Sequence, residues 1–252
     1  MDPSQAPGFA SFLAQTDAIS KTILAILLLM SIATWYLIVT KAITLVLERR
    51  KSAQFLDVFW NAPSIFAVEK HLGEHHPEEP FSHLAWHAIT ASQHHQRHGA
   101  NKLDDAGSTA EFLTRAMRRV IDEDTARLEA GLTVLASVGS TAPFLGLFGT
   151  VWGVYHALVA IGLSGQGTLD KVAGPVGEAL IMTALGLAVA IPAVLAYNGI
   201  VRANRIVLAS LDAFAHDLYA VLTTGAHMAE LAAVVPLKPA TTGPATRASR
   251  GA

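Results

Sequence analysis

Two long stretches without a charged side chain constrain the fold of this chain more than any other feature. No Asp, Glu, Lys or Arg occurs from 131 to 169, and none occurs from 179 to 201. About 20 apolar residues cross the hydrocarbon core of a bilayer as a helix, so each stretch is long enough to span a membrane. Residues 163–171 separate the two stretches as a tight turn. The sequence therefore predicts a membrane hairpin over 139–198.

Small residues recur along the first arm of this hairpin. Gly139, Gly146 and Gly153 are spaced by seven and share one helix face, with Gly149 at an interleaved position. Gly186 belongs to a similar face on the second arm. Lipid provides no hydrophobic drive for helix association, so small residues bring membrane helices together by letting their backbones approach. The pattern fits a helix-packing surface, and it fits equally well two faces that meet around a pathway.

Two pairs of polar side chains lie at matching distances from the centre of the turn. With the turn centred at Gly167, Thr150 lies almost as far before the centre as Thr183 lies after it. His156 and Glu178 are equally far from the same point. Because a helix rises about 1.5 Å per residue, each pair lies at a nearly common depth in an antiparallel hairpin. We interpret Thr150, Thr183 and Glu178 as candidates for an ion pathway, with His156 as a pathway residue or a helix-pairing residue.

Glu178 is the one carboxylate well inside these candidate spans. Ionisable groups within membranes are rare and usually face protein or water, which favours a pathway role. The alternative is a first-turn acid, because Glu178 follows Pro175 by three residues and the helix dipole favours a carboxylate there. An ideal helix also places Glu178 roughly 140° from Thr183, so the two need not line one surface. For His156 the alternative is a hydrogen bond within the helix bundle.

Residues 22–40 form a third charge-free run and predict the first membrane helix. Lys41 follows this run, and we interpret it as an anchor whose stem reaches the lipid headgroups. Basic residues come next at 49–51, whereas Asp2 and Asp17 precede the run. Because basic residues mark the cytoplasmic side, we expect the N-terminus outside and the C-terminus inside. The segment before the run lacks the basic n-region of a signal peptide, which favours an uncleaved span.

The polar residues between the first and second spans are expected to form cytoplasmic helices. A capping-box pattern at 108–111 opens an amphipathic stretch, and no obvious breaker separates that stretch from the second span. We therefore predict one unbroken helix over 108–162.

Histidines cluster in the segment before this helix. His83, His87, His94 and His98 fall within about 60° of one helix face. Two histidines four residues apart can hold a transition metal, but no Cys and only scattered acids accompany them. We therefore interpret the histidines as an exposed polar face and expect no bound metal.

Composition narrows the classes of function. The chain is 52% hydrophobic and 15% charged, an apolar excess that suits a membrane protein. The absence of Cys excludes disulfides and thiolate catalysis, and the net charge of −2 gives no argument for nucleic acid. No nucleophile–base pair or phosphate loop is visible, so we expect neither an enzyme nor a cofactor. Three helices of one chain cannot enclose a path, so a channel requires an oligomer. A membrane scaffold is the competing class.

The hairpin resembles the MotA/TolQ/ExbB proton-channel family, through GSTAPFLGLFGTVWG and GPVGEALIMTALGLAVAIPAVLAYN. ExbB-type members are the most similar, although His156 in GVYHALVAIG looks TolQ-like. The resemblance implies a homopentamer in the bacterial inner membrane around ExbD-like single-span subunits, whose membrane Asp carries the proton. It also implies that Thr150 and Thr183 correspond to the pore threonines and Glu178 to the family's glutamate.

The same resemblance implies an output. An ExbB-like subunit would couple the proton-motive force to a TonB-like protein that energises outer-membrane uptake, for example of iron–siderophore complexes. A TolQ-like subunit of the Tol-Pal envelope system is the alternative.

The expected fold is an all-α integral membrane protein with three transmembrane helices, N-out and C-in, and long helices that extend into a cytoplasmic bundle. The expected segments are a periplasmic N-terminal segment at 1–18, transmembrane helices at 19–47, 131–163 and 172–202, a cytoplasmic helical domain at 48–130, a periplasmic turn at 164–171, a cytoplasmic C-terminal helix at 203–230 and a disordered tail at 231–252.

Overall fold

The computed structural model describes residues 18–75, 77–98, 109–164 and 169–224, and all regular structure in these ranges is helical. The helices are α2 (Ala18–Asn61), α3 (Ile65–Glu74), α4 (Pro80–His98), α5 (Thr109–Glu129), α6 (Leu132–Ser164) and α7 (Leu169–Thr224). Three helical stretches of the described residues are long and apolar enough to cross a membrane, namely Ala18–Asn61, Ala110–Leu163 and Ala179–Thr224. The all-α class and the three candidate spans are thus confirmed, whereas their direction across the membrane stays a prediction.

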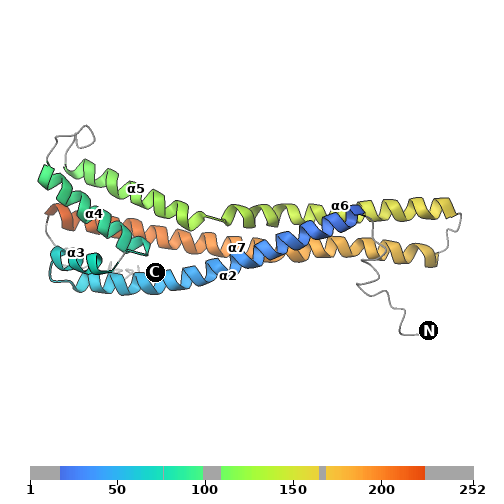
Figure 1. Ribbon diagram of the computed structural model, residues 1–252, viewed down its shortest axis with the longest axis horizontal. Helices are drawn as coiled ribbons and strands as arrows, with labels where there is room; N and C mark the ends of the chain where they lie inside the picture. The colour runs from blue at the N-terminus through green and yellow to red at the C-terminus, as the bar shows by residue number, and fades with distance from the viewer. Residues whose placement is uncertain (1–17, 76, 99–108, 165–168, 225–252) are drawn as a thin grey trace, which may run out of the picture.

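Figure 1 shows a long, narrow molecule organised around α6 and α7, which lie side by side as an antiparallel pair. Helix α2 packs against both and begins part-way along them, so the turn end of the hairpin extends beyond α2 (Figure 1). Helix α5 continues the line of α6, while α3 and α4 lie at the end opposite the hairpin turn (Figure 1). The hairpin and its continuation in α5 therefore form the central element against which the other helices pack.

Two separate apolar cores hold the helices together. The core of the membrane helices is built from α2, α6 and α7 and includes Ile23, Leu27, Leu135, Ala142, Met182 and Ala193. The core at the far end joins α2, α3, α4, α5 and α7, and its centre is Phe214, whose ring lies 5.0 Å from Phe59 and 5.6 Å from Phe81 between ring centroids. Helices α2 and α7 contribute to both cores, so they connect the candidate membrane region to the bundle.

The prediction of one unbroken helix over 108–162 is wrong. Helix α5 ends at Glu129 and α6 begins at Leu132, and between them Gly131 adopts a φ of +82°. Only glycine takes up this left-handed conformation without steric cost, and it ends helices by turning the chain. Gly131 is therefore the breaker that separates α5 from α6.

Two side chains from neighbouring helices satisfy the last carbonyls of α5. The amide of Asn204 on α7 donates to the Leu128 carbonyl at 2.9 Å, and the Lys41 ammonium on α2 donates to the same oxygen at 3.1 Å. Lys41 also lies 3.4 Å from the Arg127 carbonyl. A cation at a helix C-terminus is favoured by the helix dipole. The interpretation of Lys41 as a headgroup anchor is therefore corrected, because its ammonium caps α5.

The helix bounds refine the expected segments. Helix α7 begins at Leu169, inside the expected turn, and continues past 202 without a break as far as Thr224. The expected third membrane segment and the expected cytoplasmic C-terminal helix are thus one element over the described residues. Pro143 lies inside α6 and Pro192 inside α7. The expected N-terminal segment up to residue 17, the capping residue Ser108 and the expected tail lie outside the described residues.

Candidate functional site

The two candidate pathway threonines meet in the middle of the hairpin. Thr150 on α6 and Thr183 on α7 have their hydroxyl oxygens in direct hydrogen-bond contact. The Thr150 oxygen also lies 3.1 Å from the Gly146 carbonyl of its own helix and 3.1 Å from the Ala179 carbonyl of α7. The Thr150 hydroxyl thus contacts both a backbone carbonyl and a side chain of α7.

Small residues bring α6 and α7 close enough for this contact. A Cβ atom on Gly146 would lie 2.7 Å from the Met182 carbonyl oxygen and 3.0 Å from the Gly186 Cα. A Cβ atom on Gly186 would lie 2.7 Å from the Ala142 carbonyl oxygen. Real Cβ atoms essentially never approach backbone so closely, so the crossing of the two helices at these glycines requires the absence of a side chain.

The other small residues of the predicted face lie along the same helix pair. A Cβ atom would lie 2.6 Å from Val194 Cγ2 at Gly139, 3.0 Å from Met182 Cε at Gly149 and 3.0 Å from Ala179 Cβ at Gly153. These three glycines of α6 therefore face α7, as Gly146 does.

His156 lies on an exposed part of α6 among aromatic rings. Its ring centroid is 4.8 Å from that of Trp152 and 5.5 Å from that of Tyr155. Glu178 lies in the first part of α7, but its side chain is outside the described residues. The proposed proximity of His156 and Glu178 therefore remains a prediction.

The described residues of the hairpin bring no charged side chain to the level of the hydroxyl pair. No Asp, Glu, Lys or Arg occurs in 131–169 or 179–201, so neither arm supplies an ionised group at this level. A hydroxyl carries one donor proton and accepts through two lone pairs, so two hydroxyls in contact can hand on a hydrogen bond but cannot store a proton near neutral pH. Among the described residues of the hairpin, no carboxylate lies at this level to hold the proton.

The membrane core contains a further polar side chain that no sequence pattern indicated. Thr34 on α2 is 1% exposed, and among the described residues its hydroxyl has no hydrogen-bond partner. Other threonines of α2, such as Thr22 and Thr40, donate to the carbonyl four residues earlier. A lone threonine in an apolar run is an ordinary helix residue by pattern, and only the packing identifies this one as unusual.

A polar layer separates the two apolar cores. Ser52 of α2 donates to Glu79 at 2.7 Å, and the same carboxylate accepts from the backbone N–H of Ser82 at 2.6 Å, so it caps the start of α4. His83 of α4 contacts both carboxylate oxygens of Asp124 at 3.1 Å, and Asp124 is 1% exposed. The interpretation of the histidines as an exposed face is therefore wrong for His83, which α5 partly buries.

Burial shifts the pKa values of two side chains in this region. It raises the pKa of Glu48 above its usual range, and the nearby cations Lys41 and Arg127 oppose that rise. Burial also lowers the pKa of His87, and the neighbouring His83 lowers it further. Within the part of the chain that the structure describes, no three His, Asp or Glu side chains are placed to hold a metal ion.

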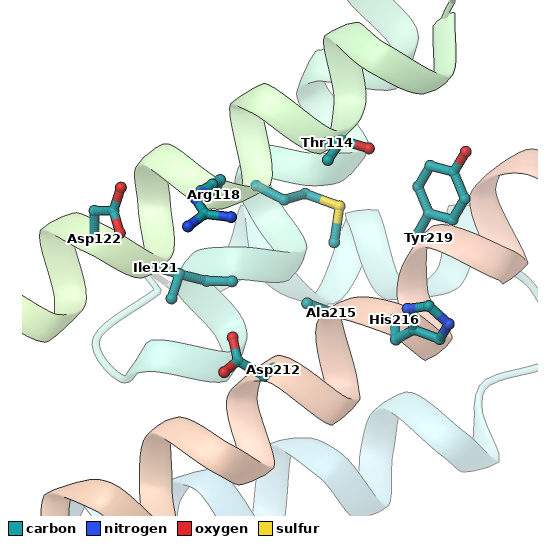
Figure 2. Close-up of a pocket in the computed structure, with 9 residues that line it drawn as sticks. Thr114, Arg118, Ile121, Asp122, Asp212, Ala215, His216 and Tyr219 are labelled. Atoms are coloured by element: carbon teal, nitrogen blue, oxygen red, sulfur yellow. The ribbon is translucent and has the colours of Figure 1, made fainter.

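A groove of about 700 Å³ lies between α5 and α7 in the bundle, away from the threonine pair (Figure 2). Its lining residues are Thr114, Met117, Arg118, Ile121 and Asp122 of α5 and Asp212, Ala215, His216 and Tyr219 of α7. The lining combines apolar side chains with charges of both signs, which suits a helix or solvent better than one charged ligand.

Comparisons with known proteins agree with this architecture. The family model described as "MotA/TolQ/ExbB proton channel family" matches residues 82–213, more than half of the chain. The chain is 43% identical over 213 residues to the biopolymer transport protein ExbB of Xanthomonas campestris, covering 84% of each chain. It is 44% identical to ExbB of Neisseria meningitidis over 81% of this chain and 91% of that one. It is also 29% identical to the Tol-Pal system protein TolQ of Pseudomonas aeruginosa, over 87% of this chain and 94% of that one.

The match extends across the candidate site and the helical bundle, because residues 82–213 contain most of α4, all of α5 and α6 and most of α7. With its three apolar helices, the chain is a multi-pass protein of the bacterial inner membrane and a transport protein rather than an enzyme. It belongs to the MotA/TolQ/ExbB proton channel family.

Proposed function

We propose that this chain is an ExbB-type subunit of a proton channel that couples the proton-motive force to a TonB-like protein, and so energises uptake across the outer membrane. The observation that carries the proposal is the contact of Thr150 and Thr183 inside a hairpin that has no charged residue at their level. The identity to ExbB proteins, higher than to TolQ proteins, supports the ExbB type over the Tol-Pal alternative. His156 remains the TolQ-like feature of the hairpin.

In this proposal the threonines hand on hydrogen bonds and a partner supplies the group that binds the proton. By family resemblance this partner is an ExbD-like single-span subunit with a membrane Asp. Such a carboxylate is needed because the described part of this hairpin offers none beside the hydroxyls. Glu178 and His156 lie nearer the turn and would act at the outer end of the path. Protonation of the borrowed carboxylate would remove its charge and change its attraction to the hydroxyls, which would bias motion of the partner against the ring.

The channel also needs several copies of this chain, a homopentamer by family resemblance, because three helices do not enclose a path. The basic residues at 49–51 favour a cytoplasmic bundle, with the N-terminus outside. Labelling of a tag placed before Asp2 in intact spheroplasts would check this orientation, and protection of the tag would overturn it.

The scaffold alternative also has an observation in its favour. The Thr150 oxygen lies 3.1 Å from two backbone carbonyls, so its hydroxyl could serve only to join the helices. A scaffold would need the shape of this contact and not its exchangeable proton.

The test replaces both hydroxyls by methyl groups of similar volume, in a Thr150→Val, Thr183→Val double variant. We expect the complex to assemble and proton-driven uptake to fall by at least about tenfold, roughly the effect of losing a required hydrogen-bond step. Thr141→Val is the matched control, because Thr141 is exposed on α6 and donates to its own helix at the Ser137 carbonyl, 2.7 Å away. An assembled double variant with unchanged uptake would support the scaffold instead.

A further inference from the structure

Helix α5 has a face that a single copy of the chain leaves uncovered. Arg115, Arg119, Asp122 and Ala126 are all exposed and follow one another at offsets of 0, 4, 7 and 11, which places them on one side of the helix. A shallow depression of about 490 Å³ runs along this side. The opposite side of α5 buries its apolar residues in the bundle, so this face is not needed to fold the chain.

Helix α7 has a largely uncovered face with the same spacing. Ile206, Ser210, Ala213 and Asp217 also lie at offsets of 0, 4, 7 and 11. The first three are exposed, Ile206 to 54% although it is a large apolar residue, and Asp217 is partly buried. The residues of α7 that fill the bundle core are others, namely Leu211, Phe214 and Leu218.

The two faces lie at the same height in the molecule. The Asn204 amide bonds the Leu128 carbonyl at 2.9 Å, which fixes these two residues at one level. Helices α5 and α7 run in opposite directions (Figure 1), so positions equally far before Leu128 and after Asn204 share a level. Arg115 precedes Leu128 by the same number of positions as Asp217 follows Asn204.

The rest of each face follows the same register. Arg119 and Ala213 are equally far from the reference pair, and so are Ala126 and Ile206, which lie close to it. The two faces therefore carry complementary side chains at matched levels. The pairs are a cation and an acid (Arg115 and Asp217), a long and a small side chain (Arg119 and Ala213), and two apolar side chains (Ala126 and Ile206).

We propose that the α7 face of one copy (Ile206, Ser210, Ala213 and Asp217) packs on the α5 face of the next copy (Arg115, Arg119, Asp122 and Ala126). This inference rests on the proposed membrane oligomer. A bilayer holds all copies at one depth and in one direction, so copies are related by rotation about the membrane normal and touch only at equal heights. Such a head-to-tail contact joins unlike faces and closes into a ring, which supplies the enclosure that one hairpin lacks.

The contact has a specific chemistry. Arg115 would pair with Asp217 of the neighbouring copy, an acid that forms no ion pair with the described residues of its own chain. The Arg119 guanidinium is already held by Glu123 at 3.0 Å and would lie over the small side chain of Ala213. Ala126 and Ile206 would give the end nearer the membrane an apolar contact. Charge pairing then sets which copies meet and at what register.

Disulfide trapping tests the contact directly, because the natural chain has no Cys. An Ala126→Cys copy and an Ile206→Cys copy are expressed together and oxidised in membranes. We expect a disulfide-linked dimer at least about tenfold more abundant than for Ala126→Cys with Ile43→Cys, since a disulfide forms only across Cα separations of about 4.4–6.8 Å. Ile43 is a matched control, because it is 55% exposed and lies close in sequence to Lys41, which bonds the same Leu128 carbonyl.

The two possible failures are distinguishable. An intact oligomer with normal uptake but no more 126–206 dimer than the control would overturn this interface and leave the proposed channel standing. A charge swap then tests the ion pair in the same assay. Arg115→Asp and Asp217→Arg alone should each reduce the trapped dimer severalfold, and the two changes together should restore it. A double variant no better than the single variants would overturn the Arg115–Asp217 pairing.

Discussion

The Thr150 hydroxyl has more acceptors than it has protons. It lies within hydrogen-bond distance of the carbonyls of Gly146 and Ala179 and of the Thr183 hydroxyl, yet it can donate to only one oxygen at a time. When Thr150 donates to a carbonyl, its oxygen is left to accept from Thr183. When Thr150 donates to Thr183 instead, the Thr183 proton has to pass to another acceptor, which is the step that a hydrogen-bond relay requires.

Glu48 belongs to the polar layer, and its ionisation should weaken the fold. Burial raises its pKa in the folded chain, so its contribution to stability is complete below its ordinary pKa and is lost as pH rises through the folded value. We expect Glu48→Gln to raise the thermal midpoint of the purified protein at pH 7.5, by the equivalent of less than about 1 kcal/mol because Glu48 is only half-buried. At pH 4 the two proteins should unfold alike.

Glu123 serves as the control in the same experiment, because its pKa is shifted in the opposite direction to that of Glu48. The Arg119 hydrogen bond lowers the pKa of Glu123, so Glu123→Gln should not raise the midpoint at pH 7.5. Differential scanning fluorimetry at several pH values measures both variants. A Glu48→Gln protein that is less stable than the parent at pH 7.5 would contradict the role assigned to burial.

At the level of helices, the crossing of α6 and α7 depends on backbone contact. A methyl group at Gly186 would meet the Ala142 carbonyl at 2.7 Å, so Gly186→Ala should force the helices apart and cost about 1–3 kcal/mol. Gly199→Ala on the same helix has no atom within 4 Å of the new Cβ and should be neutral or slightly stabilising. Equal thermal midpoints for the two variants would show that the crossing tolerates a side chain.

The joint between α5 and α6 depends on a different property of glycine. Gly131→Ala has to hold a φ of +82° with its Cβ 3.1 Å from Leu37, and should destabilise the protein by about 1–2 kcal/mol. Gly73→Ala in α3 meets nothing within 4 Å and serves as the control. Thermal unfolding of the two variants separates backbone strain from a general effect of removing glycine. If Gly131→Ala unfolds at the same temperature as Gly73→Ala, the joint is not strained.

The same helices show which features of the fold could be predicted from the sequence and which could not. The level of Thr150 and Thr183 follows from counting residues along two helices, because helix rise is constant. The break at Gly131 does not follow, because glycine is common in membrane helices and the left-handed turn is stabilised by Lys41 and Asn204 from elsewhere in the chain. The contact of His83 with Asp124 joins residues 41 positions apart on different helices, and periodicity within one helix carries no information about it.

The whole molecule is a membrane hairpin continued by a helical bundle, with a polar layer between their two cores. On α2 this layer falls between Ile38 of the membrane core and Phe55 of the bundle core, and Lys41, Glu48 and Ser52 lie within that interval. The unbroken helix α7 passes through the layer, so a rotation of the hairpin about its long axis would be transmitted to the bundle. One copy still encloses no path, which is why the uncovered faces of α5 and α7 matter for the channel.

Proton flux through the reconstituted complex tests the proposed relay most directly. The chain is purified with its single-span partner, placed in liposomes and given an imposed membrane potential, and a pH-sensitive dye inside reports proton entry. We expect the Thr150→Ser, Thr183→Ser complex, which keeps both hydroxyls, to conduct within about threefold of the parent, and the double valine complex to conduct at least about tenfold less. Equal flux through the valine and parent complexes would contradict a role for the hydroxyl pair in proton transfer.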